Sequence, residues 1–338
     1  MASAETRTDA HGYFDISVPL SLILGFAEDY QKVIVNAKHE LIITRSKTDI
    51  NAILQGPITA DNPAENYKIT LQKMEWLIPY VKVSDERKIK LLNFIAKDTP
   101  ITMDFRTLEL YEYPLLPAAS KHVWVVKTSN QLEKPRYIIL GFQTGRRNTL
   151  TANASRFDHC NMRDVKLFLN SQSYPYGNLN LDIDHNQYST LYNMFVNFQD
   201  SYYGKEAEPL MNRSEFLGKA PLFVIDCSKH NEYLNSGPVD IRLEFESTTP
   251  FPPNTSAYCL ILHDRIVEYN PISGGYQTNF WSSYFIKMDK TKTDYSRSYS
   301  NNQNGQRDTS LKGSTAYNGS VYSGRYGSIG EERSKKNK

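Results

Sequence analysis

The sequence lacks any long apolar run. None of its 338 residues lies in a stretch that approaches the roughly 20 apolar residues needed to span a bilayer. The opening residues, MASAETRTDAHGYF, also lack the charged and apolar regions of a secretory signal. We therefore expect a protein without membrane contact that is intracellular, either cytoplasmic or nuclear, and not secreted.

Cysteine is scarce as well. Cys160, Cys227 and Cys259 are odd in number, far apart and without metal-ligand spacing, so we expect reduced thiols packed in strands. His159 directly precedes Cys160. Because neighbours on a strand point to opposite faces, we expect a buried cysteine and a surface histidine rather than a thiolate–imidazole pair.

The lysine of a phosphate-binding loop is missing from the one segment that resembles such a loop. In RYIILGFQTGRRN, Gly141 and Gly145 have the required interval, but Arg146 follows where the motif needs lysine. The next residues, TLTANASRFDHCN, have no helical pattern. The segment therefore predicts a strand followed by a turn, and not a nucleotide site.

One acidic cluster remains, in LDIDHNQYSTLY. Asp182, Asp184 and His185 lie close in sequence, but the glycine and terminal glutamate of a calcium loop are absent. We expect Asp184 or Asn186 to cap the helix that follows. The sequence 263–265, His-Asp-Arg, is interpreted as a strand end.

Catalytic constellations are likewise missing. The seven histidines are scattered singly, and there is no Ser/His/Asp order, zinc-binding helix or paired acid. We predict no catalytic residues, no cofactor, no metal site and no small-molecule substrate, and hence a protein that is not an enzyme.

Short apolar segments separated by turn signals make up most of the chain. Nine of them have the length and pattern of strands: VIVNAKHELIITR, YKITLQKMEWLIPYVKV, ITMDFRTLELYEY, KHVWVVKTS, RYIILGFQT, DVKLFLNSQ, PLFVIDCSK, VDIRLEFES and SAYCLILHDRIVEY. Turn signals about every ten residues favour an antiparallel sandwich or barrel. The pattern does not alternate with helices as a parallel sheet requires.

Two segments have helical periodicity instead. In SDERKIKLLNFIAKD, Ser84 is a suitable N-cap for a helix whose apolar stripe holds Ile89, Leu92 and Ile95. The other is NQYSTLYNMFVNFQDSYYG, in which Gly204 ends the helix. Its apolar stripe holds Tyr188, Leu191, Tyr192, Phe195 and Phe198.

The two ends of the chain differ in composition from the body. Residues 1–12 are polar and predicted flexible, and the Ser/Tyr/Gly/Asn-rich tail 275–338 buries too little apolar surface to fold. Residues 289–338 hold ten Lys/Arg and five Asp/Glu, whereas the net charge of the whole chain is only +2, so the body is mildly acidic.

We favour a tail that is solvated and binds no specific ligand. Weak contact with single-stranded nucleic acid is the alternative, through interleaved basic and aromatic side chains. These are Arg297, Arg307, Lys312, Arg325, Tyr295, Tyr299, Tyr317, Tyr322 and Tyr326.

Several long segments, in order, resemble a known family. They are EKPRYIILGFQTGRRN, FDHCNMRDVKLFLNSQSYPYGNLNLDI, YSTLYNMFVNFQDSYYG, APLFVIDCSKHNEYLNSGPVDIRLEFES and NTSAYCLILHDRIVEYNPISG. They are similar to the second half of the double jelly-roll major capsid (hexon-like) proteins of Polinton/Maverick elements and related DNA viruses. Upstream, VPLSLILGFAEDYQKVIVNAKHELIITR and KITLQKMEWLIPYVKVSDERKIKLLNFI resemble the later part of the first roll. The resemblance runs from about Phe14 to Gly274.

The resemblance implies an all-β fold of two tandem eight-stranded jelly rolls with a few helical insertions. It implies residues 13–97 as a partial first roll and 98–274 as the second. Three copies would form a pseudo-hexagonal homotrimeric capsomer in a virion, with no catalytic residues; the sequence does not locate the partner interface.

Two departures from the family stand out, namely the short first roll and the low-complexity tail. They suggest a truncated or domesticated copy, an endogenous viral element in an arthropod genome. Two other interpretations stay open. One is a co-opted β-sandwich that binds a protein or glycan partner, for which the loop SQSYPYGNLN offers aromatics beside asparagine. The other is an enzyme that depends on His159 or Asp184.

Overall fold

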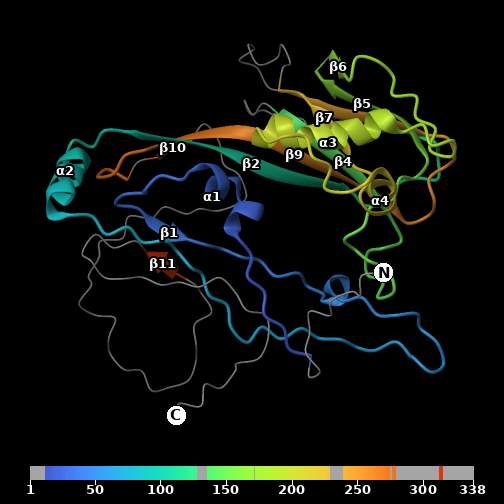
Figure 1. The fold of residues 1–338 in the computed structure, drawn as a ribbon, viewed down its shortest axis with the longest axis horizontal. Coiled ribbons are helices and arrows are strands. Elements are labelled where there is room, and N and C mark those ends of the chain that lie inside the picture. Colours follow the sequence, from blue (N-terminus) through green and yellow to red (C-terminus); the bar gives the residue numbers. More distant parts are fainter. Residues whose placement is uncertain are drawn as a thin grey trace. The chain divides into compact units, whose positions relative to one another are not determined.

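The structure is a computed structural model that describes residues 12–127, 135–170, 172–228, 239–274, 276–278 and 312–314. It divides into two compact units, which we call unit 1 and unit 2 (Figure 1). Unit 1 comprises Met1–Ser46, Lys68–Phe105 and Ile266–Lys338, and unit 2 comprises Lys47–Tyr67 and Arg106–Arg265. Each unit is described by itself.

Strands outnumber helices in the described residues. The strands are β1 (Lys38–Glu40), β2 (Ile101–Tyr113), β3 (Lys121–Lys127), β4 (Pro135–Thr144), β5 (Met162–Leu169), β6 (Gln172–Tyr174), β7 (Phe223–Asp226), β8 (Ile241–Ser247), β9 (Thr255–Tyr269), β10 (Tyr276–Thr278) and β11 (Lys312–Ser314). The helices are the 3-10 turns η1 (Leu20–Leu22) and η2 (Ile50–Ala52) and the α-helices α1 (Gly25–Asp29), α2 (Asp85–Ala96), α3 (Ser189–Tyr203) and α4 (Arg213–Lys219). Among these helices, none has the length and apolar character that crossing a membrane requires.

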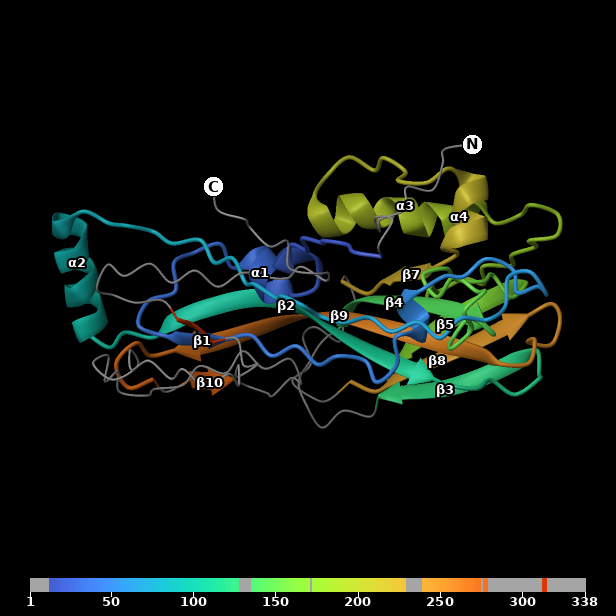
Figure 2. The same cartoon turned by 90° about the horizontal axis from the view of Figure 1, so that it is seen from below.

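The strands of unit 2 pair in a nested order. β5 pairs with β6, β4 with β7, β3 with β8, and β2 with β9. The pairs β4–β9 and β5–β8 then join these antiparallel pairs into two sheets (Figure 2). One sheet holds β2, β9, β4 and β7, with β10 as a fifth strand paired to β9, and the other has the order β3-β8-β5-β6. The eight strands β2 to β9, nested in this way in two sheets, form a jelly roll.

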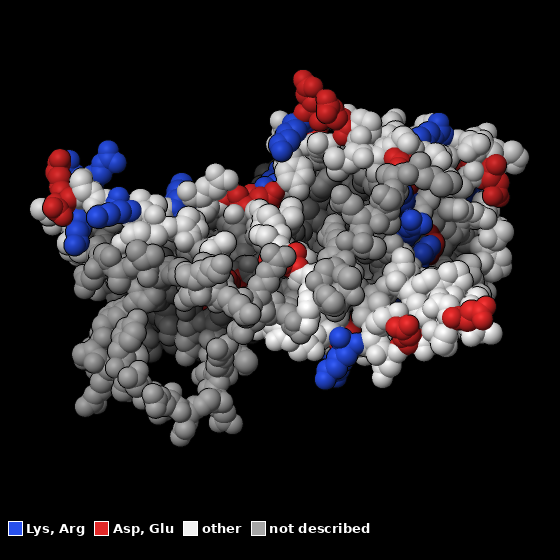
Figure 3. Space-filling model, turned by 60° about the horizontal axis from the view of Figure 1, so that its bottom comes forward, with Lys and Arg blue, Asp and Glu red and all other residues white. Residues whose placement is uncertain are grey.

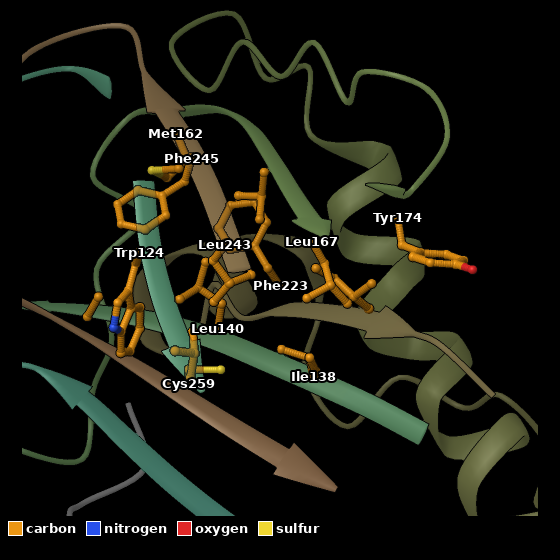
Figure 4. Close-up of a cluster of buried hydrophobic side chains, with 14 of the residues drawn as sticks. Trp124, Ile138, Leu140, Met162, Leu167, Tyr174, Phe223, Leu243, Phe245 and Cys259 are labelled. Atoms are coloured by element: carbon orange, nitrogen blue, oxygen red, sulfur yellow. The ribbon is translucent and has the colours of Figure 1, made fainter. Parts of the chain in front are cut away.

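The two sheets of the jelly roll enclose one large core. Along β8 and β5 the side chains alternate between buried and partly exposed, as expected for strands with one face inward. Phe142 of β4 meets Phe245 of β8 with ring centroids 5.2 Å apart, and Figure 4 shows Leu140, Phe223 and Leu243 in the same cluster. In all, 26 buried side chains belong to this core.

Helix α3 lies over the outer face of the β4–β7 sheet. Tyr137 on β4 points away from the inner core and meets Phe198 of α3 at 5.2 Å, so β4 is covered on both faces. The predicted helix is confirmed, and Gly204 ends it in the left-handed region at φ +63°. The predicted cap is wrong, because the N-cap residue is Tyr188 and no side chain caps it. Asp184 and Asn186 lie further upstream, in a turn that Asp182 closes by accepting the backbone N–H of Gln187.

Unit 1 has a much smaller hydrophobic core. Its largest cluster of buried apolar residues among those described is Met103, Ala37 and Tyr269, with four partly buried neighbours against them. The Tyr269 hydroxyl donates to the carbonyl of Asn36 at 2.6 Å. The predicted helix α2 is confirmed, but Ile95 is its only buried side chain. Unit 1 therefore holds much of its apolar surface in contact with solvent.

Seven of the nine predicted strands are confirmed where the structure describes them, from β2 to β9. The residues 263–265 lie inside β9, so the predicted strand end there is wrong. Of the segment 33–45, only β1 is a strand. The prediction for 67–83 is wrong, because that stretch forms no strand and Lys73 alone makes an isolated bridge. Alternation predicts which face is apolar, but a ladder also needs a neighbouring strand.

The predicted disordered tail lies largely outside the described residues. Within 275–338 the structure describes β10, which pairs with β9, and β11, which pairs with β1. The flexible start 1–12 is outside as well, apart from Gly12. Disorder of the tail and the boundary between residues 97 and 98 both stay predictions.

Candidate surfaces for self-association

The segment that resembled a phosphate-binding loop is a strand and a turn, as predicted. Gly141 lies where a Cβ would come within 2.7 Å of both Leu222 and Phe157, so close packing explains this glycine. Gly145 has φ +59° and turns the chain at the end of β4. Both glycines therefore serve the fold, and neither requires a phosphate.

A half-buried ion pair closes the excursion that follows β4. Arg146 donates from Nε and Nη2 to the two carboxylate oxygens of Asp158, at 2.8 and 2.5 Å. The backbone N–H of Thr144 donates to the same carboxylate at 2.9 Å. Burial alone would raise the pKa of Asp158, but the hydrogen bonds from Arg146 and Thr144 outweigh burial and lower it. Arg146 is thus engaged in the fold and is not a free anion ligand.

The neighbouring cysteine and histidine occupy a turn. Cys160 and Asn161 both have positive φ, so the premise that His159 and Cys160 sit on a strand is wrong. Both side chains are half-buried, which also corrects the expected buried cysteine and surface histidine. The His159 ring accepts the backbone N–H of Asn161 at 3.1 Å, and the Cys160 thiol lies 3.7 Å from the Thr144 hydroxyl. Burial raises the pKa of Cys160 to about 11, so the thiol stays protonated near neutral pH.

The other two thiols are buried in the jelly-roll core. Cys259 lies on β9 and Cys227 directly follows β7, and neither forms a disulfide. Burial raises the pKa of Cys259 to about 12 and that of Cys227 well above its ordinary value. These cysteines act as small apolar side chains.

Acidic and histidine side chains do not assemble into a metal site in the part of the chain that the structure describes. Asp182 and His185 do meet, with the His185 ring nitrogen 2.8 Å from the carboxylate, but on an exposed loop. That hydrogen bond is the main cause that lowers the pKa of Asp182. The pair stabilises a local turn, and the predicted absence of enzymatic activity stays a prediction.

One surface depression lies on the segment 47–67 of unit 2. Gln55 anchors this segment, because its N–H donates to the carbonyl of Leu150 and its side-chain amide donates to that of Pro63. No titratable side chain lines the depression, so it offers no acid–base chemistry. It is lined by Leu54, Gln55, Gly56, Pro57, Ile58 and Thr151.

Exposed apolar side chains are the most informative surface feature. Of the large ones among the described residues, fifteen belong to unit 1 and ten to unit 2. In unit 2 they include Val123 and Val125, which are 56% and 59% exposed on the edge strand β3. In unit 1 they include Leu77 and Val81, at 65% and 57%. Exposed apolar side chains that lie on one face of an element, as Val123 and Val125 do on β3, mark surfaces for association.

Charge is less concentrated than apolar surface. On the face in Figure 3, the Lys/Arg and Asp/Glu side chains lie in small mixed groups, and no large area carries one sign. A basic stripe of the kind that binds nucleic acid is therefore not visible on that face. The basic and aromatic tail residues of the nucleic-acid prediction lie outside the described residues, except Lys312, for which only the backbone is described.

Comparison with protein families agrees with the strand topology. A model of the double jelly roll-like domain matches residues 4–267 of the 338. The chain belongs to this double jelly roll-like family. Its fold is accordingly β-rich with few helices, as the sequence predicted. Among curated proteins, none matches the sequence.

Solved structures of viral capsids are similar in part. A chain of the Sputnik virophage structure is 12% identical with a TM-score of 0.34, covering 54% of this chain and 40% of that one. VP54 of PBCV-1, fitted into a Sputnik reconstruction, is 8% identical with a TM-score of 0.36, covering 59% and 55%. The mavirus major capsid protein is 10% identical with a TM-score of 0.28, covering 54% and 42%. This chain spans about half the length of the structures it matches, and the family assignment rests on the sequence model.

Sequence reasoning missed two features of these surfaces. Arg146 and Asp158 are twelve positions apart with no motif between them, so only the fold brings them together. The exposure of 67–83 was also missed, because its alternation indicated a strand. The sequence pattern of 67–83 does not show whether a neighbouring strand runs along it.

Proposed function

We propose that this protein is a structural, self-associating protein that forms homotrimeric capsomers of a double jelly-roll shell. The observation that carries the proposal is the family match over residues 4–267, together with the nested order of β2 to β9. A jelly roll with a large apolar core is a rigid body that keeps its surface loops in place, which suits a subunit of an ordered shell.

The distribution of apolar surface supports association over a monomeric role. Unit 1 exposes large apolar side chains on α2 and on the segment 67–83, while its own core has three buried residues. Contact with further copies would remove that surface from water, at about 25 cal/mol per Å². A virion location follows from the same proposal. The Polinton-type origin in an arthropod genome and the domesticated state belong to it as well.

The molecular mass in solution tests the proposal. Size-exclusion chromatography with light scattering on the full chain should give a discrete species of about three times 38.8 kDa. The same mass after removal of residues 276–338 would show that the tail is not required. A monomer, or an aggregate of no fixed mass, would contradict the trimer.

A monomer would favour the second candidate, a binding module, for which one observation speaks. Tyr176 in the loop after β6 is 77% exposed, with its ring 5.4 Å from that of Tyr174 and Asn178 close in sequence. An exposed aromatic beside an amide can stack on a sugar. Binding to a glycan array that Tyr176→Ala abolishes would support this candidate, and absence of binding would exclude a glycan as its ligand.

A further inference from the structure

Helix α2 lies at the edge of unit 1 (Figure 2) and has two apolar stripes, one of which is exposed. The first stripe holds Ile95, which is buried, and Leu91, which is partly buried, so it packs against the rest of the protein. The second holds Ile89, Leu92 and Ala96, all exposed, at 59% and 44% for the two large side chains. At 3.6 residues per turn, the second stripe is centred about 100° around the helix from Ile95.

The exposed stripe has the spacing of a helix–helix contact. Asp85, Ile89, Leu92 and Ala96 follow one another at intervals of four, three and four residues. This is the order d-a-d-a of a heptad, whose a and d positions face a second helix. Ala96 is small, so a second helix can approach its end of the stripe closely. The spacing therefore indicates another helix as the occupant of this face.

Helix α3 is a useful contrast, because its aromatic stripe is covered within the chain. Phe198 meets Tyr137 of β4 with ring centroids 5.2 Å apart, and Phe195 meets Phe216 of α4 at 4.8 Å. Of the large apolar side chains of α3, Tyr203 is the one that is exposed. α2 exposes three, although it has twelve residues against the fifteen of α3.

The two ends of α2 carry opposite charges. Asp85 and Glu86 lie in its first turn, and Lys97 is its C-cap residue. Two α2 helices that ran in the same direction would set acid against acid and lysine against lysine. In opposite directions each acidic end meets a basic end, and the two helix dipoles attract each other. The charges therefore favour a second α2 in the antiparallel direction.

One antiparallel register matches the apolar side chains of the stripe. With the two-fold axis midway between positions 90 and 91, Ile89 lies opposite Leu92 of the second copy. Asp85 then lies opposite Ala96 of the second copy, and the reverse pairs follow by symmetry. The two large side chains of the stripe meet at its centre, and the small one lies at each end.

The same register brings a lysine to each acidic end. Glu86 and Lys97 of the second copy lie on the same flank of the pair, offset by two residues or about 3 Å along the axis. Glu86 already pairs with Lys90 of its own helix at 2.7 Å, but a carboxylate can accept from more than one donor. An ion pair at each end would fix the register that the apolar contact allows.

We propose that the α2 helices of two copies of this chain pack as an antiparallel pair through Ile89, Leu92 and Ala96. This inference rests on the proposed function, in which copies of the chain associate, and it adds a two-fold contact to the three-fold one. An isologous contact of this kind closes after two copies, so α2 links copies in pairs.

The contact is small by itself. Two helices of twelve residues are each about 18 Å long. They bury less than the roughly 1,200–2,000 Å² of a stable interface. The pair is therefore weak between single chains, and it is strengthened where an assembly presents several copies of α2 at once. Covalent trapping detects such a contact better than the mass in dilute solution.

Disulfide cross-linking of the full chain tests the register. Helix axes lie about 8–10 Å apart and Cα atoms about 2.3 Å from each axis, so facing Cα atoms come within roughly 4–6 Å, which a disulfide spans. Asp85→Cys and Ala96→Cys chains, mixed under mild oxidation by copper phenanthroline, should therefore give a covalent dimer.

Each variant alone is the control for direction. In the antiparallel pair the two copies of residue 85 lie about 16 Å apart along the axis, and so do the two copies of residue 96. Asp85→Cys alone and Ala96→Cys alone should therefore stay monomeric on a denaturing gel. The wild type should stay monomeric as well, which controls for the three native cysteines.

A charge placed on the stripe tests which face of α2 makes the contact. Leu92 and Phe94 are 44% and 40% exposed, and two positions turn a helix by about 200°, so they lie on nearly opposite faces. Leu92→Glu in both cross-linking variants should lower the yield of covalent dimer at least about tenfold, because it buries a carboxylate opposite Ile89 of the second copy. Phe94→Glu is the matched control and should leave the yield unchanged. Equal losses, or no loss with Leu92→Glu, would overturn the proposal.

The helix pair and the capsomer fail separately in these experiments. A trimer by light scattering without a covalent dimer from the mixed variants would overturn the α2 pair and leave the capsomer. A covalent dimer from the mixture, in a chain that forms no trimer, would support the pair and overturn the capsomer. Cross-linking of each variant alone, as strong as that of the mixture, would also overturn the pair, because the contact would then lack the antiparallel register.

Discussion

The two compact units of this chain differ most in what lies at their centres. Among the described residues, the core cluster of unit 2 holds 26 buried apolar side chains, and that of unit 1 holds three. The strands β2 to β9 of the jelly roll form continuous ladders, whereas the segment 67–83 of unit 1 has only an isolated bridge, at Lys73, within the described part of the chain. The difference teaches that an alternating pattern becomes a strand only where a neighbouring strand runs along it.

The energetic consequence follows from burial. A fully buried Leu, Phe or Met contributes about 1.5–3 kcal/mol, whereas ordering one residue's backbone costs about 1–2 kcal/mol. Three buried residues therefore offset the ordering of only a few positions. Burial in the jelly-roll core of unit 2 therefore contributes far more stabilisation than burial in the three-residue cluster of unit 1.

We expect the largest loss of unfolding free energy from a substitution in the jelly-roll core. Phe245 is 2% exposed and its ring contacts those of Phe142 and Phe251, so Phe245→Ala should lower the free energy of unfolding by about 3–5 kcal/mol. Phe94→Ala is the matched control on α2, where the side chain is 40% exposed and the loss should stay below about 1 kcal/mol. Urea unfolding followed by circular dichroism measures both. Equal losses would contradict the difference between the units.

We expect the next largest loss of stability from a substitution in the core cluster of unit 1. Met103 is 1% exposed and belongs to the three-residue core, so Met103→Ala should cost about 2 kcal/mol, the low end for such a change, because a small core can collapse around the gap. Hydrogen exchange should speed up in unit 1 and stay unchanged along β5 and β8. Faster exchange throughout unit 2 would show that the two cores are energetically coupled.

A smaller effect comes from the ion pair after β4. Arg146→Ala leaves the half-buried Asp158 carboxylate without its main donor, and we expect a loss of about 1–2 kcal/mol. Arg147→Ala is the control, because Arg147 pairs with Glu112 on the surface with 56% of its side chain exposed and should cost less than about 0.5 kcal/mol.

The pH dependence of the same pair has a definite sign. The pKa of Asp158 is lower in the folded chain than the value of about 4 that an unperturbed aspartate has. The stabilisation of the fold by this ion pair is therefore fully present when the pH is above the ordinary pKa of an aspartate. It is lost as the pH falls through the lowered pKa that Asp158 has in the folded chain. In urea unfolding between pH 6 and pH 2, the gap between wild type and Arg146→Ala should narrow as the pH falls below about 4. A gap that persists at acid pH would contradict an electrostatic origin.

The smallest expected signal is chemical reactivity. Because burial raises the pKa of all three thiols, iodoacetamide at neutral pH should label Cys160 slowly and Cys227 and Cys259 only in unfolded protein. Mass spectrometry of digested protein gives the three rates. Rapid labelling of Cys259 in native protein would mean that the jelly-roll core opens.

Much of unit 2 was predictable from sequence because its elements are locally consistent. β5 and β8 alternate with period two, and the α3 segment repeats its aromatic residues at helical spacing and ends at Gly204. In each case a strand partner or a sheet face completes the pattern within the chain. Local preference and tertiary context therefore agree, and the prediction is confirmed.

The failures have physical causes of their own. The cap of α3 was assigned to Asp184 or Asn186, but the Asp182–Gln187 turn takes up that stretch before the helix begins at Ser189. Cys160 sits in a left-handed turn that the pattern of its neighbours does not reveal. The Arg146–Asp158 pair depends on how the loop folds back. A strand at 67–83 was the largest error, because pairing is a property of two segments and the sequence pattern describes one.

Hydrogen exchange as a function of protein concentration tests the central claim most directly, namely that the jelly roll of unit 2 is complete within one chain. The account predicts that the amides of β4, β5 and β8 are protected in dilute protein as strongly as in protein shown by light scattering to be associated. Fast exchange along these strands in dilute protein, slowed only on association, would contradict it.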